Sequence, residues 1–125
     1  QGIRSDVIPR IATAFCGGLS RTGNLCGAVS GGVMGISLAL GRDLPGESRD
    51  AAFAAVQRFL AQFKARFGSL TCLSLTGCHL GTEEGREKFH LIRDSIDCAG
   101  FVRTGASLAA EAIQIGLEEK THADQ

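Results

Sequence analysis

Apolar side chains in this sequence recur three and four residues apart, and this spacing constrains the fold more than any other feature. The clearest run places five apolar side chains along one face of an amphipathic helix: Phe53, Val56, Leu60, Phe63 and Phe67. Gly68 follows this run directly, and glycine commonly ends a helix at such a position. No stretch alternates apolar and polar residues as a half-buried strand would. The sequence therefore predicts an all-α chain.

The same reasoning predicts further helices over residues 7–14, 25–40 and 82–93, with Thr82 as the N-cap of the third. Between Leu25 and Leu40 the residues are apolar nearly all round, so we expect that central helix to be buried on most sides. A last helix near the C-terminus carries a second apolar stripe made of Phe101, Gly105, Leu108, Ala112 and Ile115. Loops are expected over 41–47 and 76–81.

The length of the chain suits one domain, since 125 residues of which 44% are hydrophobic can bury a core. We predict a single-domain bundle of five or six helices over residues 1–125, built around the Gly-rich central helix, with a polar tail at 117–125. The chain opens Gln1-Gly2 rather than with Met, which leaves room for residues upstream.

Charge and aromatic content argue against two classes of partner. The 13 basic and 13 acidic residues cancel, and Trp and Tyr are absent, so we expect no nucleic-acid binding. The longest uncharged stretch, over 22–41, is rich in Gly and Ser, so we expect no membrane span. Nothing at the N-terminus resembles a signal peptide, and we expect a cytoplasmic protein.

Three glycines of the central helix share one face, because Gly27, Gly31 and Gly35 are four residues apart. Glycine costs about 1 kcal/mol relative to alanine inside a helix, so three on one face indicate a close approach there. A neighbouring helix of the same chain is one interpretation. The other is a cofactor or a second subunit, which would make this face a site of homodimerisation.

Three of the five cysteines fall at predicted helix starts. Cys26 lies in the first turn if Asn24 is the N-cap, and Cys98 is the first residue if Asp97 is. Cys72 takes the third position of a short helix if Ser69 caps it. The helix dipole at such positions stabilises a thiolate and lowers its pKa, and a thiolate attacks disulfides and binds metals.

The remaining thiols are weaker candidates. Cys16 ends an apolar run, and Cys78 is expected in a loop beside His79, so both are typical of small buried side chains. Cys78 and His79 are nevertheless candidate ligands of a metal site. No C-x-x-C pair, phosphate loop or dinucleotide fingerprint is present.

The cysteine-containing segments together resemble one known family. They are Phe15-Cys-Gly-Gly-Leu-Ser-Arg-Thr-Gly23, Cys26-Gly-Ala-Val-Ser-Gly31, Phe67-Gly-Ser-Leu-Thr-Cys72, Leu75-Thr-Gly-Cys-His-Leu80 and Cys98. The chain resembles, from about Ile8 to Ala112, the putative redox-active family labelled C-GCAxxG-C-C, with its Cys-Gly-Ala-x-x-Gly core.

The resemblance implies a redox role carried by four characteristic cysteines. Cys26, Cys72 and Cys98 match three of them by motif position. The fourth is expected upstream of the Gly-rich segment, so either Cys16 takes its place or a cysteine precedes Gln1.

Three functions remain open from the sequence. The first is redox or electron transfer, with Cys26, Cys72 and Cys98 as redox thiols that form a disulfide or, with Cys16, hold an iron–sulfur cluster near Gly27 and Gly31. Such a protein would need a redox partner protein. The second is a metal-binding module, with zinc or another metal held by cysteines and His79. The third is a dimeric interaction protein with inert cysteines.

Overall fold

The computed structural model describes residues 2–125, so Gln1, the first residue of the predicted domain, lies outside the described part. Seven segments carry helix labels: α1 (Ile8–Ala12), α2 (Cys16–Leu19), α3 (Gly27–Leu40), α4 (Asp50–Phe67), α5 (Cys72–Thr76), α6 (Glu83–Ile92) and α7 (Cys98–Ala123). Two 3₁₀ turns, η1 (Thr13–Phe15) and η2 (Arg93–Ser95), extend α1 and α6. Residues 2–125 contain no strand, which confirms the predicted all-α fold.

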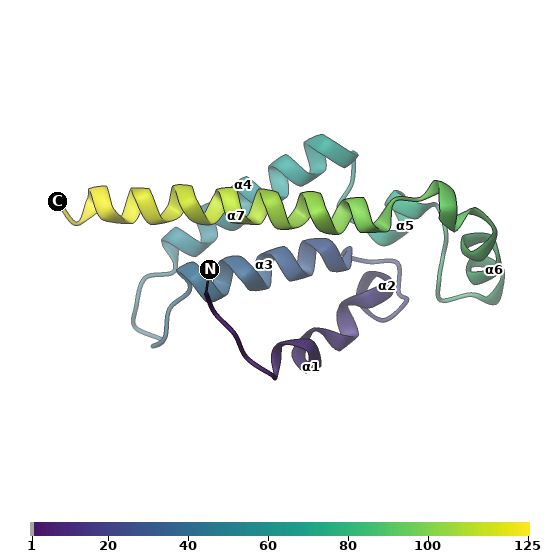
Figure 1. Ribbon diagram of the computed structural model, residues 1–125, viewed down its shortest axis with the longest axis horizontal. Helices are drawn as coiled ribbons and strands as arrows, with labels where there is room; N and C mark the ends of the chain where they lie inside the picture. Colours follow the sequence, from purple (N-terminus) through teal and green to yellow (C-terminus); the bar gives the residue numbers. More distant parts are fainter. Residues whose placement is uncertain (1) are drawn as a thin grey trace.

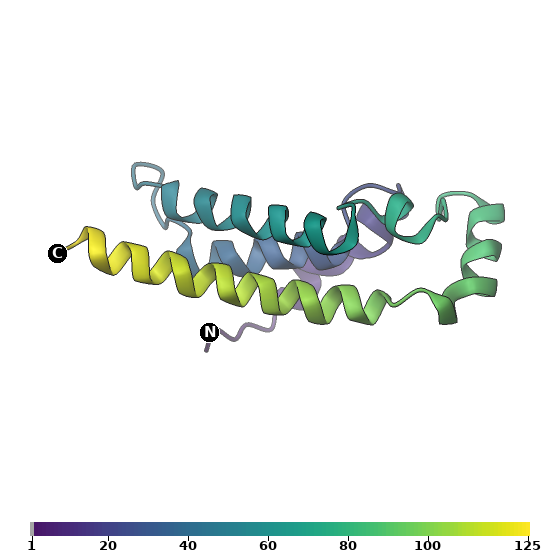
Figure 2. The ribbon, with the colours of Figure 1, turned by 90° about the horizontal axis from the view of Figure 1, so that it is seen from above.

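Three long helices form the body of the molecule. Figures 1 and 2 show α3, α4 and α7 side by side, with α5 and α6 at the end where α7 begins. The core between the three helices consists of Val29, Ile36, Leu40, Ala52, Ala55, Phe59, Phe63, Ala109, Ala112 and Ile113. The central helix predicted from the sequence is α3, which packs against both α4 and α7. The short helices lie beside these three long helices or at their ends.

The buried face of α4 is rotated from the stripe read in the sequence. Phe63 is fully buried and Val56, Leu60 and Phe67 pack at the margin of the core, as predicted. Phe53, in contrast, is 53% exposed, with the Arg49 guanidinium 5.2 Å from the centre of its ring. The buried positions of α4 are instead Ala52, Ala55 and Phe59. The two small alanines let α4 approach its neighbours closely.

The glycine face of α3 does not meet another helix of the chain. A Cβ on Gly31 or Gly35 would have no atom within 4 Å, so the expected helix crossing at these two residues is wrong. The close contact falls one residue later, because Gly32 lies directly against the Phe59 ring. Gly27 contacts the Phe15 carbonyl, where an added Cβ would lie 3.3 Å from the oxygen. A dimer or cofactor at the Gly31–Gly35 face stays a prediction.

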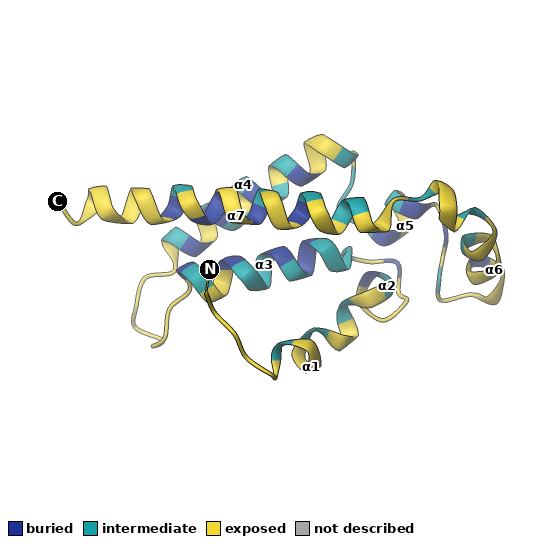
Figure 3. Cartoon of the chain, in the orientation of Figure 1, coloured by how far each residue is buried: buried dark blue, intermediate teal, exposed yellow. Residues whose placement is uncertain are grey.

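The predicted polar tail is helical. α7 continues to Ala123, and Figure 3 shows its last turns exposed beyond the bundle. Side chains four residues apart support this end, since Gln114 donates a hydrogen bond to Glu118 at 2.8 Å. Within residues 2–125, no helix combines the length and the apolar character needed to cross a membrane.

Candidate functional site

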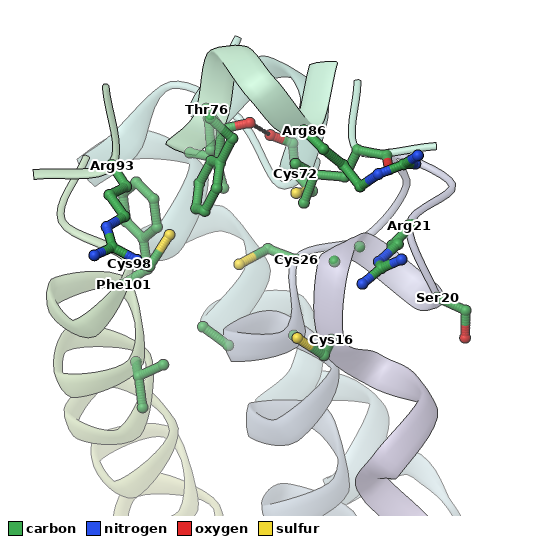
Figure 4. A pocket seen from close by; sticks show the side chains of 18 of the residues that line it. Cys16, Ser20, Arg21, Cys26, Cys72, Thr76, Arg86, Arg93, Cys98 and Phe101 are labelled. Carbon is green, nitrogen blue, oxygen red and sulfur yellow. Dashed lines mark hydrogen bonds between the residues drawn. The ribbon is translucent and has the colours of Figure 1, made fainter. Parts of the chain in front are cut away.

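A pocket of about 840 Å³ opens at the end of the bundle where α3, α5 and α7 begin. Cys16, Cys26, Cys72 and Cys98 all line it, and Figure 4 shows their sulfur atoms turned toward one central space. The four cysteines are separated by up to 82 residues in the sequence and come from four different helix starts. The fold therefore brings together the three cysteines singled out from helix caps and adds Cys16 to them.

Cys26 and Cys72 are held next to each other by a short antiparallel pairing of the segments that precede α3 and α5. The Cys26 amide donates to the Leu70 carbonyl at 2.8 Å, and the Cys72 amide donates to the Asn24 carbonyl at 2.7 Å. Leu25 and Thr71 form an isolated β-bridge between these bonds. Because each cysteine directly follows the bridge, the pairing fixes both thiols at the same side of the pocket.

Two of the three helix caps differ from the sequence prediction by two residues each, and the third agrees with it. Cys26 is itself the N-cap of α3, and its carbonyl accepts the first amides of the helix. Thr71, rather than Ser69, caps α5 with its side chain, so Cys72 is the first residue of that helix. Asp97 caps α7 as predicted, with its carboxylate accepting from the Gly100 amide at 2.8 Å.

Cys16 is positioned by a left-handed turn that sequence reasoning missed. Five consecutive residues have positive φ angles between 58° and 70°: Gly17, Gly18, Leu19, Ser20 and Arg21. The label α2 covers this turn, which closes with the Ser20 amide donating to the Cys16 carbonyl at 2.9 Å. The remaining right-handed α-helices number six within residues 2–125, in line with the predicted five or six. The Gly-Gly pair was the one sequence signal of this turn.

Gly18 allows the turn to reach the second pair of cysteines. A Cβ at this position would clash with the Cys72 side chain and lie 2.7 Å from the Asn24 carbonyl oxygen. The Asn24 amide donates to the Gly18 carbonyl at 3.1 Å, which ties the turn to the segment before Cys26. A residue larger than glycine here would separate Cys16 from Cys26 and Cys72.

The pKa of the buried Cys72 thiol is raised, contrary to the expectation from its helix start. Desolvation is the largest cause, Thr76 acts in the opposite direction, and the neighbouring thiols of Cys26, Cys16 and Cys78 raise it further. The Cys72 amide is already bonded to the Asn24 carbonyl, so it offers no free hydrogen bond to a thiolate.

The pKa of the Cys98 thiol is raised as well. Desolvation in the pocket contributes most, followed by the thiols of Cys26 and Cys72, then by Asp97 and Cys16. The carboxylate that caps α7 therefore opposes the effect of the helix dipole on the adjacent thiol. For Cys72 and Cys98 the raised pKa is opposite to the lowered pKa predicted from their helix starts.

The two other candidate ligands lie outside the pocket lining. Cys78 is 1% exposed, and its thiol donates to the Thr76 carbonyl at 3.5 Å. The His79 ring accepts a hydrogen bond from the Gly81 amide at 3.2 Å, within its own loop. Neither residue is among those that line the cysteine pocket.

The candidate glycines divide between two cavities. Gly27 lines the cysteine pocket, where α3 begins. Gly31 and Gly35 line a separate groove of about 420 Å³ between α3 and α7, which Gly27 also borders. Of the two glycines proposed near a cofactor, the fold thus brings only Gly27 to the cysteines.

All five thiols are free, and no three His, Cys, Asp or Glu side chains within residues 2–125 are placed to share one metal ion. Apart from Ser20, Thr76 and His90, the rest of the pocket wall is apolar or cationic. Arg21, Arg86 and Arg93 line it together with Phe89 and Phe101, and no carboxylate belongs to the described lining. No sequence pattern pointed to Arg86 and Arg93, which α6 and η2 carry to the pocket.

Comparison with known proteins gives one match. A family model described as "Putative redox-active protein (C_GCAxxG_C_C)" matches residues 1–112, which include all five cysteines. No curated protein and no solved structure matches the chain.

Proposed function

This chain belongs to the C_GCAxxG_C_C family of putative redox-active proteins, and from that membership we propose that it transfers electrons by means of the four pocket cysteines. The observation that carries the proposal is the convergence of Cys16, Cys26, Cys72 and Cys98 on one pocket. Cys78, the remaining thiol, is buried elsewhere. The redox group would therefore be located at the start of α3, α5 and α7.

The form of redox centre we propose is an iron–sulfur cluster with these four cysteines as ligands. Four thiolates are the usual ligand set of such a cluster, and bound there it supplies reversible electron transfer. A single zinc ion would need sulfurs roughly 3.8 Å apart, from the Zn–S distance of about 2.3 Å in a tetrahedron. Among residues 2–125 no such group of ligands is present, whereas the ligands of a cluster lie farther apart.

The surroundings of the thiols suit a negatively charged centre. Phe101 and Leu75 restrict water on the apolar side, and the arginines supply positive charge to offset thiolate ligands. Cys16 and Cys98 are exposed, so a partner protein could approach the centre closely from their side. The electron would come from, or go to, that redox partner, while the bonds of the chain itself stay unchanged.

A second candidate is thiol–disulfide exchange, which the exposure of Cys16 and Cys98 favours. One of these thiols would attack a disulfide of the partner, and a second pocket thiol would release the partner as a dithiol. The chain would lose two electrons and two protons and gain one disulfide, while the partner disulfide is reduced to two thiols.

Iron and sulfide analysis of anaerobically purified protein tests the first candidate. We expect iron and acid-labile sulfide in about equal amounts and a visible absorption that dithionite bleaches. Replacing any one of the four pocket cysteines with serine should lower the cluster content, whereas Cys78→Ala serves as the matched control and should retain it.

Protein that binds neither iron nor sulfide, even after anaerobic reconstitution, would exclude the cluster. In that case, loss of two titratable thiols on mild oxidation would support the disulfide mechanism. Tightly bound zinc in place of iron would instead indicate a metal-binding module.

A further inference from the structure

One wall of the cysteine pocket carries no cysteine. It is formed by α6 and η2, which contribute Arg86, Phe89, His90 and Arg93. α6 buries only Gly85, and Figures 1 and 2 show it set apart from the long helices at the pocket end. The main contribution of this helix to the fold is thus the wall that it adds to the pocket.

The arginines of the pocket have no acidic partners. The ion pairs between described residues are Arg58–Glu119 and Arg103–Asp97, so Arg21, Arg86 and Arg93 form none within residues 2–125. Arg86 donates one hydrogen bond to the Leu80 carbonyl at 3.0 Å, which leaves most of its guanidinium donors available. The segment 83–94 also carries Glu83, Glu84, Glu87 and Asp94, but none of these carboxylates lines the pocket, so the positive charge is confined to the pocket wall.

The guanidinium groups flank the space that the thiols face. In Figure 4, Arg21 and Arg86 lie on one side of the pocket and Arg93 lies on the other side, next to Cys98. Arg21 is held there by the left-handed turn, since it is the last of the five residues with positive φ. Guanidinium groups bind carboxylates, sulfonates and phosphates through paired, charge-assisted hydrogen bonds.

The remaining lining is apolar and sized for a small molecule. Leu75, Leu80, Phe89, Phe101 and Val102 supply aliphatic and aromatic surface. A volume of about 840 Å³ lies within the range of small-molecule sites, which pair apolar walls with a few charged groups. A purely inorganic anion would leave this apolar surface unused.

We propose that the pocket binds a small organic anion, with its acidic group held by Arg21 and Arg86 and its apolar, aromatic part packed against Phe89 and Phe101. This inference goes beyond the redox proposal and requires none of the thiols. It names a ligand class, an aromatic or apolar carboxylate, sulfonate or phosphate, and makes α6 the ligand-binding element of the chain.

Isothermal titration calorimetry of the intact protein tests the proposal with naphthalene-2-sulfonate as the anionic probe and 2-naphthol as its uncharged counterpart. We expect saturable binding of one sulfonate per chain and weaker binding of the naphthol. The double variant Arg21→Gln/Arg86→Gln should weaken sulfonate binding about tenfold or more, because two charge-assisted contacts are removed.

The control is Arg66→Gln, since Arg66 is an exposed arginine on α4 outside the pocket. It should bind the sulfonate as the unchanged chain does, and circular dichroism melts should show that both variants are folded. The absence of saturable sulfonate binding would overturn the proposal. Equal loss in the control, or naphthol binding as tight as sulfonate binding, would overturn the role of the arginines.

Discussion

The pocket thiols differ in how far they are withdrawn from water. Cys72 is buried, Cys26 is half-buried, and Cys16 and Cys98 are exposed. The pKa values of Cys72 and Cys98 are both raised by desolvation and by neighbouring thiols. Thiolates gathered around one space repel one another, and a bound cation or a disulfide would remove that repulsion.

The first prediction concerns the alkylation of these two thiols in the reduced, metal-free protein. Iodoacetamide labelling can be followed at each cysteine by mass spectrometry as the pH is varied. The apparent pKa values of Cys72 and Cys98 in the folded chain should be higher than the pKa values of the same residues in urea. The reason is that only the thiolate reacts, and the fold disfavours it at both sites. Values at or below those of the unfolded chain would contradict the desolvation argument.

The raised pKa values of Cys72 and Cys98 also make the stability of the fold depend on pH. The unfolded chain releases the two protons at a lower pH than the folded chain. The contribution of these thiols to stability is therefore complete below the ordinary thiol pKa of about 8.5 and is lost as the pH rises through the folded values.

At the scale of elements, the left-handed turn after Cys16 is the unusual part of the molecule. Leu19, Ser20 and Arg21 adopt positive φ angles that cost roughly 1–2 kcal/mol each for residues with a side chain. The turn is held by hydrogen bonds from the Thr22 hydroxyl to the Gly18 and Leu19 carbonyls, each 2.9 Å long. Strain of this kind is typical of functional sites, and here it borders the pocket.

The second prediction is that Gly18→Ala destabilises the protein by about 1–3 kcal/mol or more, the range for an overpacked contact. The new methyl group would press on Cys72 and on the Asn24 carbonyl, and alanine disfavours the positive φ. Urea unfolding measures the loss, and cluster content should fall with it. The control is Gly46→Ala, where an added Cβ meets no atom within 4 Å. Equal stability of the two variants would show that α2 does not approach Cys72.

At the scale of the whole molecule, three long helices provide a rigid frame, and the pocket lies at one of its ends. Gly32 lets α3 approach Phe59 of α4, and Gly105 lets α7 approach the Ala28 carbonyl, where an added Cβ would lie 3.2 Å from the oxygen. These contacts set the spacing of α3 and α7, whose N-terminal ends carry Cys26 and Cys98. Packing along the bundle thus determines the width of the pocket at its end.

The third prediction compares two neighbouring glycines of α3. Gly32→Ala should destabilise the protein by about 1–3 kcal/mol, because the fully buried Phe59 ring must move. Gly31→Ala should stabilise it by about 0.5–1 kcal/mol, since alanine favours a helix and meets open space. Urea unfolding separates the two, and equal effects would contradict this packing.

The predicted homodimer through Gly27, Gly31 and Gly35 can be tested with the same helix. Gly31→Leu should leave a monomeric protein folded but should disrupt a dimer that buries this face. Sedimentation velocity at several concentrations measures the difference, and an unchanged monomer in both proteins would exclude the dimer.

The sequence alone determined the helical class, the approximate extent of the long helices and the placement of Cys26, Cys72 and Cys98 at helix starts, because periodicity and capping are local properties. It indicated Thr82 and Asp97 correctly as caps. Only the tertiary structure decided which apolar face of α4 is buried, that Gly32 rather than Gly31 makes the close contact, and that Cys16 joins the pocket while Cys78 does not. These outcomes depend on how segments far apart in sequence pack and exclude water, and the same packing reversed the expected pKa shifts of Cys72 and Cys98.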